Sequence, residues 1–196
     1  MIRTEKTPIA DADLPVEAFK DHLRLGTGFS DESLQDPVLR GFLRAAIVAV
    51  EGRIGRILFK REFDFEVSKL ASHRELELVM APVRSIEKIN YYNVLSGDIE
   101  VDLSHFHLEA SVRSARLIGP FPQISQGGKL TVTVCVGLAD GWDDLPADLA
   151  QAIFLLATHY YEHRTQTSFD AGCTPFGVLS LIERYKAVRL SLGGGQ

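Results

Sequence analysis

The sequence predicts an α+β protein in which N-terminal helices and C-terminal helices flank a central antiparallel sheet. Apolar residues recur at three- and four-residue steps near both ends of the chain, as in amphipathic helices. Between them, from about residue 56 to about residue 136, β-branched and aromatic residues alternate with polar ones, as in half-buried strands. The helices and strands are segregated along the chain, which is not the order expected of parallel β-α-β units.

Two helices are predicted in the N-terminal part. The first covers about residues 15–25, where Phe19 and Leu23 lie on one face and Gly26 supplies a stop. The second covers about residues 36–54, and its predicted buried face consists of Leu39, Phe42, Leu43, Ala46, Ile47 and Val50.

The central segment is predicted to form a single antiparallel sheet. The β-branched and aromatic residues gather in three runs: Phe59, Arg61, Phe63, Phe65 and Val67, then Leu76, Leu78 and Met80, then Val83, Ile86, Ile89 and Tyr91. Further extended segments are expected at 101–108, 115–118 and 129–136. Turns are expected at 96–98 and 126–128, and we interpret the second as a hairpin turn.

A strong helix is predicted over about residues 145–164, opening at Asp144-Leu145-Pro146. Its apolar face consists of Leu149, Ile153, Leu156 and Tyr160. After a loop at 165–174, a last helix follows Pro175, with Leu179, Ile182 and Tyr185 on one face.

Composition narrows the class of protein. The chain has 196 residues, 45% of them apolar and 24% charged, which suits one folded domain. A net charge of −5 argues against general nucleic-acid binding, because such proteins neutralise phosphates with Lys and Arg. An acidic surface can still let DNA pass without holding it. A charged N-terminus, short apolar runs and only two cysteines, Cys135 and Cys173, predict a non-exported protein of a reducing cytoplasm.

The strongest catalytic pattern is formed by His159, Glu162 and His163, which match the H-x-x-E-H arrangement of inverted zinc peptidases. On a helix the two histidines share a face and could hold one zinc ion, with the glutamate activating water. Such a site needs a third protein ligand, and little chain follows His163 to supply one. A metal-dependent hydrolase is therefore the alternative, and histidines at the polar edge of a packed helix are the simpler interpretation.

Two other motifs have simpler structural interpretations. His105 and His107 would point to one face of a strand and could ligate a metal, but no Cys or acidic partner is spaced with them. The segment Gly127-Gly128-Lys129 lacks both the earlier glycine and the following Ser or Thr of a phosphate loop.

The acidic group Asp140, Asp143 and Asp144 precedes a predicted helix. Carboxylates at a helix start can cap its first turn and are favoured by the helix dipole. No Ser-His-Asp or Cys-His arrangement is evident from spacing. From the residues alone, the sequence predicts an α+β domain without a visible active site.

The C-terminal segment is amphipathic. Basic residues at 184, 186 and 189 alternate with Tyr185, Val188, Leu190 and Leu192 before a run of glycines. Such a segment can pack on its own domain or insert into a groove of a partner.

Several segments, taken together in order, resemble the gp6-like head–tail connector (adaptor) proteins of long-tailed phages. They are residues 15–24, 50–56, 81–86 with 91–92, 132–137, 145–164 and 175–185. Within that family the chain looks most similar to the adaptors of Rhodobacter-type gene transfer agents. The segment 138–142, Leu-Ala-Asp-Gly-Trp, departs from common members.

The resemblance implies a structural subunit without catalytic activity, and with it we expect no enzyme activity, no cofactor and no metal. Such proteins form a ring, usually of twelve copies, between the portal protein and a tail-side stopper or tail-terminator ring, and DNA passes through the lumen. It implies a single connector domain at 1–183 and a C-terminal arm at 184–196 that docks on the portal. It also implies assembly in the bacterial cytoplasm and a final place at the head–tail joint. The implied portal contacts are Tyr185, Val188, Arg189, Leu190 and Leu192.

Overall fold

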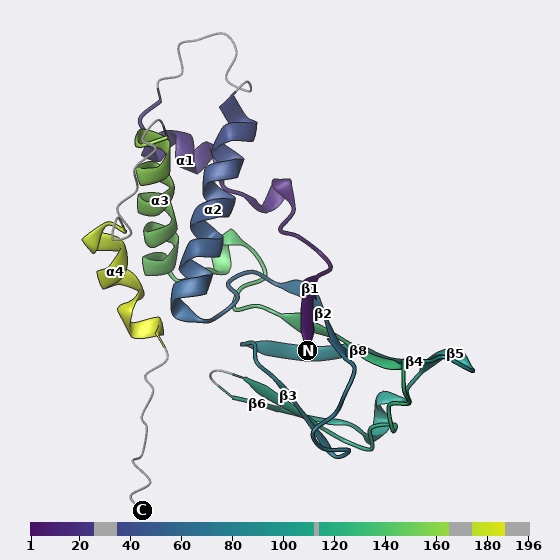
Figure 1. Ribbon diagram of the computed structural model, residues 1–196. Coiled ribbons are helices and arrows are strands. Elements are labelled where there is room, and N and C mark those ends of the chain that lie inside the picture. Colours follow the sequence, from purple (N-terminus) through teal and green to yellow (C-terminus); the bar gives the residue numbers. More distant parts are fainter. Residues whose placement is uncertain (26–34, 112–113, 165–173, 187–196) are drawn as a thin grey trace, which may run out of the picture.

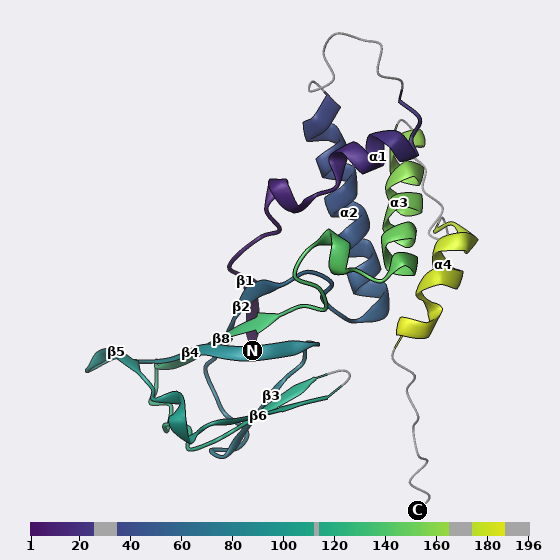
Figure 2. The same ribbon diagram turned by 180° about the vertical axis from the view of Figure 1, so that it is seen from behind.

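The computed structural model describes residues 1–25, 35–111, 114–164 and 174–186, and it confirms the α+β class (Figure 1). Helices α1 (Val16–His22) and α2 (Asp36–Ile54) precede most of the strands, and helices α3 (Ala147–Glu162) and α4 (Phe176–Ile182) follow them. The helices lie together at one end of the molecule and the sheets at the other (Figures 1 and 2). None of the helices in the described ranges is long and apolar enough to cross a bilayer.

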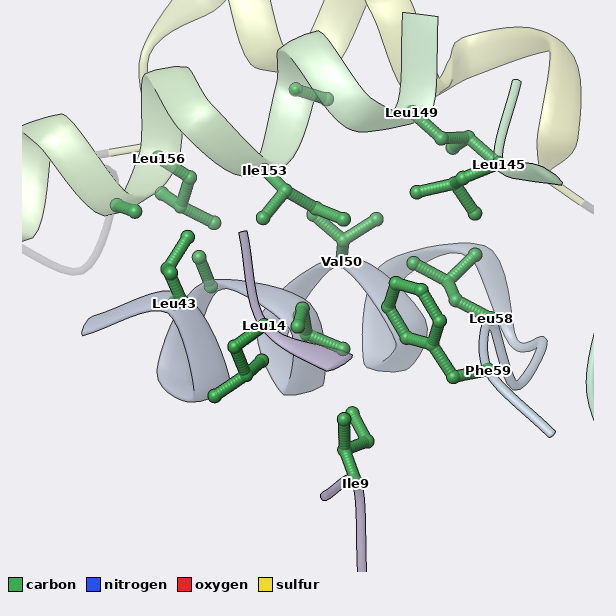
Figure 3. Packing of buried hydrophobic residues seen from close by; sticks show 14 of the residues in the cluster. Ile9, Leu14, Leu43, Val50, Leu58, Phe59, Leu145, Leu149, Ile153 and Leu156 are labelled. Carbon is green, nitrogen blue, oxygen red and sulfur yellow. The ribbon is translucent and has the colours of Figure 1, made fainter. Parts of the chain in front are cut away.

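The helices enclose one hydrophobic core. Leu43 and Val50 of α2 face Ile153 and Leu156 of α3, and Leu14 from the segment before α1 closes one side (Figure 3). These side chains are almost fully buried, and each contributes about 1.5–3 kcal/mol relative to an exposed position. The apolar periodicity of the two long helices therefore correctly predicted their buried faces.

The strands form two antiparallel sheets where the sequence predicted one. The larger has the order β1 (Ile2–Glu5), β2 (Arg61–Val67), β8 (Lys129–Val136), β4 (Val83–Asn93) and β5 (Gly97–Glu100). The smaller has the order β3 (Glu75–Leu78), β7 (Ala115–Ile118) and β6 (His107–Ala110). A second core forms from both sheets, with Phe63, Phe65, Val132 and Ile89 from the larger and Leu78 and Leu117 from the smaller.

Two differences from the predicted strands have local causes. Strand β1 was not predicted, because all four of its residues are exposed and backbone pairing with β2 holds it in place. The extended segment predicted at 101–108 is interrupted by the 3-10 turn Leu103–His105, whose first N–H groups are capped by Asp102 accepting from the Ser104 N–H at 3.0 Å.

Two turn predictions also need correction. The glycine turn at 126–128 leads into β8, but β8 pairs with β2 and β4 and not with the preceding strand β7, so it is not a hairpin turn. Helix α3 begins at Ala147 and not at Asp144-Leu145, because Leu145 precedes Pro146 and both have extended backbone.

Gly137 allows two backbone segments, residues 58–60 and 137–139, to approach each other where the helices join the larger sheet. The Lys60 N–H donates to the Ala139 carbonyl at 2.9 Å, and the Ala139 N–H donates to the Leu58 carbonyl at 2.8 Å. Gly137 has φ +148°, and a Cβ there would lie 2.5 Å from the Lys60 nitrogen. Only glycine fits this approach of two backbones.

The unusual segment 138–142 contributes to the same joint. The Trp142 ring stacks on Phe59, with centroids 6.2 Å apart, and on Phe154 of α3, with centroids 4.9 Å apart. Phe154 in turn stacks on Phe19 of α1 at 5.7 Å. A line of aromatic rings thus joins two helices to the chain that enters the sheet.

A buried ion pair also joins α2 to the sheet. Arg61 of β2 donates to the Glu51 carboxylate of α2 through Nη2 and to the Glu5 carboxylate of β1 through Nη1, the latter at 2.8 Å. The Leu58 N–H donates to Glu51 Oε1 at 2.8 Å. Burial raises the pKa of Glu51, while the Arg61 charge and the Leu58 N–H act in the opposite direction.

Replacing Gly137 by Ala should lower the free energy of unfolding by more than about 2 kcal/mol, through backbone strain and the clash with Lys60. Gly41→Ala is the matched control, since a Cβ at this exposed helical position has nothing within 4 Å. That variant should gain roughly 0.5–1 kcal/mol from helix propensity. Urea denaturation measures both, and equal stabilities of the two variants would contradict the role of Gly137.

Arg61→Leu should cost about 3 kcal/mol of unfolding free energy near neutral pH, because it leaves the buried Glu51 carboxylate unpaired. The folded-state pKa of Glu51 then rises further above its unfolded value. The penalty is therefore absent below the unfolded pKa and grows as pH rises towards the folded pKa. Denaturation should show a smaller deficit at about pH 5 than at about pH 8. The double variant with Glu51→Gln should lose this pH dependence, and a pH-independent deficit of Arg61→Leu alone would contradict the pairing.

Candidate functional site

The base of the predicted C-terminal arm is fixed to the start of α3 by three side chains, which we call the arm anchor: Asp148, Arg184 and Tyr185. The Tyr185 hydroxyl donates to Asp148 Oδ1 at 2.7 Å, and Arg184 Nη2 lies 2.8 Å from Asp148 Oδ2. Arg184 also donates to the Tyr185 oxygen at 2.6 Å and lies over the Tyr185 ring. Residues far apart in sequence thus form one closed triangle.

Local structure places each member of the anchor. Asp148 is in the first turn of α3, where the helix dipole favours a carboxylate. Arg184 and Tyr185 lie in a 3-10 turn, Glu183–Tyr185, that continues α4. A tyrosine hydroxyl is protonated at neutral pH and can donate to Asp148, and burial raises its pKa further.

Of the five residues predicted to contact the portal, the structure places Tyr185 in this anchor. Val188, Arg189, Leu190 and Leu192 lie outside the described residues. Tyr185 packs against its own domain through its hydroxyl, as one of the two interpretations of the amphipathic segment anticipated. Its partner Asp148 was not predicted, because no local pattern links two residues this far apart.

The catalytic pattern at the end of α3 is only partly assembled. The rings of His159 and His163 lie with centroids 4.5 Å apart, while Glu162 is exposed on the helix. His159 Nε2 is buried without a hydrogen-bond partner among the described residues. Within the same ranges, no group of three or more His, Cys, Asp or Glu is arranged to hold a metal ion. The pair therefore lacks the third ligand that a zinc site needs, as far as the described chain extends.

The other histidine pair is not arranged as the sequence suggested. His105 ends the 3-10 turn and His107 begins β6, so the two do not share the face of one strand. Lys129 of the glycine-rich segment pairs with Glu66 at 2.9 Å across the sheet, as a structural residue does.

The acidic residues before α3 also differ from expectation. Asp140 pairs with Arg84, with Oδ1 and Nη1 2.5 Å apart. Asp143 and Asp144 belong to the short turn Trp142–Asp144, and α3 has no side-chain cap at its N-cap, Pro146. The prediction that Asp144 and its neighbours cap α3 was wrong, since Pro146 separates them from the helix.

Two exposed apolar surfaces were missed by the sequence reasoning. One is the outer face of α2, which carries Val38 and Val48. The other is the tip of the β4–β5 hairpin, with Val94, Leu95 and Ile99. A signal for the first existed, because α2 has a second set of apolar or small residues at three- and four-residue steps, opposite the set assigned to the core.

Comparison with solved structures decides the family. A chain in the neck of an empty GTA particle, computed with C6 symmetry, is 37% identical over 99% of both chains, with a TM-score of 0.83. The chain belongs to the head–tail connector family of gene transfer agents. This connector is also 36% identical to a chain in the virion of a native gene transfer agent particle (TM-score 0.80). It is 33% identical to one in the neck of a native GTA particle computed with C12 symmetry (TM-score 0.78), again over 99% of both chains.

No protein-family model and no curated protein matches this connector, so its role is taken from the similar solved structures. Two of the similar solved chains are parts of GTA particle necks and the third is part of a GTA virion, and this connector is a structural neck component.

Asp148→Asn should loosen the arm anchor while leaving the helical core folded. The substitution removes the charge that holds Arg184 and Tyr185, so the chain after α4 should open locally more often. Limited proteolysis with trypsin should therefore cut after Arg184 and Lys186 about fivefold faster, with an unchanged circular dichroism spectrum. Asp144→Asn, at an exposed position, is the control and should cut at the native rate. Equal rates in both variants would show that the anchor does not hold the arm.

Proposed function

We propose that this connector is the adaptor subunit of a gene transfer agent neck, in which copies form a ring between the portal protein and a tail-side stopper or tail-terminator ring. The observation that carries the proposal is the 37% identity, over 99% of both chains, to a chain in a GTA particle neck. The subunit assembles in the bacterial cytoplasm and ends at the head–tail joint.

The ring follows from the symmetry of the similar assemblies. The similar neck structures were computed with C6 and C12 symmetry. Cyclic symmetry with more than two copies uses heterologous contacts, so each copy presents two different surfaces to its two neighbours. A ring of twelve copies agrees with both symmetries.

Passage of DNA through the lumen fits the charge of the chain. The net charge is −5, and many basic side chains on the described surface are paired with carboxylates, as Lys60 and Arg84 are with Asp140. Like charge disfavours adhesion of the phosphate backbone. The adaptor thus guides DNA without sequence-specific binding and without a cofactor.

Contact with the portal is assigned to the arm, residues 184–196, beyond a connector domain of residues 1–183. Its contact residues are Tyr185, Val188, Arg189, Leu190 and Leu192. The arm anchor fixes the base of the arm to α3, and because Asp148 holds the Tyr185 hydroxyl within the subunit, only the ring of Tyr185 is assigned to the portal. The remaining surface of the domain meets the neighbouring subunits and the tail-side ring.

Deleting residues 187–196, beyond the arm anchor, should leave the melting temperature unchanged and abolish incorporation into portal-containing particles. The core loses no described contact, while the portal loses its partner segment. Electron microscopy and immunoblotting of purified particles measure incorporation. Deletion of 193–196 alone is the control and should incorporate normally. Normal incorporation of the longer deletion would refute the docking assignment.

A further inference from the structure

The side of α2 that faces away from the core is apolar along its whole length. We call this surface the α2 outer face: Val38, Gly41, Ala45, Val48 and Gly52. All five residues are exposed, and Val48 is 60% exposed. A surface helix of a monomeric protein normally carries charged and polar residues on this side. The α2 outer face therefore has the composition of a contact surface.

The glycines of this face are not explained by the subunit itself. A Cβ built on Gly41 or Gly52 meets nothing within 4 Å, and neither residue has a positive φ. Each glycine inside a helix costs about 0.8–1 kcal/mol relative to alanine. Neither the backbone conformation nor internal packing requires them, whereas close approach of another chain would.

A protruding apolar surface of matching kind lies on the β4–β5 hairpin. We call it the hairpin tip: Val94, Leu95 and Ile99. Leu95 is 94% exposed, and the turn that presents it is ordered by Asn93, whose side-chain oxygen accepts from the Leu95 N–H at 3.0 Å. A large exposed leucine on a formed turn is a knob, and the small residues of α2 leave room for one.

The charges around the two surfaces are partly complementary. Arg40, Arg44 and Arg53 flank the α2 outer face; Arg40 pairs with Asp36 and Arg44 with Asp11, whereas no carboxylate among the described residues pairs with Arg53, which donates to the Thr174 hydroxyl. The hairpin and the turn after it, residues 92–102, contain Asp98, Glu100 and Asp102 and no Lys or Arg, and Glu100 pairs with Lys88 of β4. Opposite charges at the rim of an apolar contact favour one orientation and disfavour contact between two like surfaces.

The two surfaces also lie apart on the subunit. The hairpin projects at the end of the larger sheet that points away from the helices, in both views (Figures 1 and 2). A copy cannot close such a contact on itself without unfolding. It can close it with the next copy, as a head-to-tail ring requires.

We propose that the occupant of the α2 outer face is a second copy of this chain, whose hairpin tip packs on it as the repeating contact of the ring. The inference rests on the proposed function for the existence of the ring and adds which surfaces form it. Leu95 lies between Val48 and Gly52 of the neighbour, with the acidic hairpin next to the basic flanks of α2.

Photo-cross-linking from position 48 tests the contact. Val48 is replaced by p-benzoylphenylalanine in the full chain, particles are purified and irradiated, and the cross-linked peptides are identified by mass spectrometry. The expected product is a dimer of this chain in which position 48 is joined to residues 92–102. A cross-link to any other segment or protein, or none, in particles whose neck contains the chain, would overturn the inference.

Matched substitutions add a functional readout. Val48→Asp and Leu95→Asp each place a charge in the proposed contact and should lower the number of copies per particle at least about tenfold. Val79→Asp is the control, since Val79 is 66% exposed and belongs to neither surface. Normal incorporation of the first two variants would overturn the contact and leave the adaptor function standing. Absence of the native chain from purified necks would instead refute the proposed function.

Discussion

The buried ion pair between Glu51 and Arg61 is the interaction on which the arrangement of this connector depends. One charge comes from α2 and the other from β2, and both are almost completely removed from water. A buried charge that loses its partner costs several kcal/mol, so the helices cannot slide over the sheet without a large penalty. Gly137 and the stacked ring of Trp142 act at the same joint. The helical part and the sheet part therefore keep fixed positions relative to each other.

The sequence predicted the parts of this fold that are stabilised by burial. Helix α2 has the predicted bounds, because its core face repeats regularly, and Phe63 and Phe65 of β2 point into the sheet core as their alternation indicates. Strand β1 escaped prediction because it is held by backbone hydrogen bonds and has no buried face. The division into two sheets was not predicted either. Alternation shows that a strand has one buried side, but it does not show which other strand covers that side.

In the candidate sites, too, contacts within one helix were predictable and contacts between distant segments were not. The histidines of the H-x-x-E-H pattern were predicted to share a helix face, and His159 and His163 do lie together. The partner of Tyr185 could not be predicted, because Asp148 is brought to it only by the packing of α4 on α3. The apolar surface of α2 was present in the sequence as a second stripe of two valines with glycine and alanine, but it is weaker than the core stripe and was given no role. The family resemblance came from ordered segments spread over the whole chain, and it was confirmed.

The proposed contact surfaces are small, so each contact between two copies is weak by itself. Val48 and Leu95 are large apolar groups, but glycine and alanine supply most of the α2 outer face, so two free copies gain little by meeting. In the proposed assembly, docking of the arms on a portal would bring neighbouring copies to high effective concentration, and the same weak contact would be repeated around the ring. When the last copy closes the ring, it makes a contact on both of its sides, so no copy is left with an unpaired contact surface. On this account the fixed joint at Glu51 and Arg61 matters for assembly, because a ring closes only when every copy holds its two surfaces at the same angle.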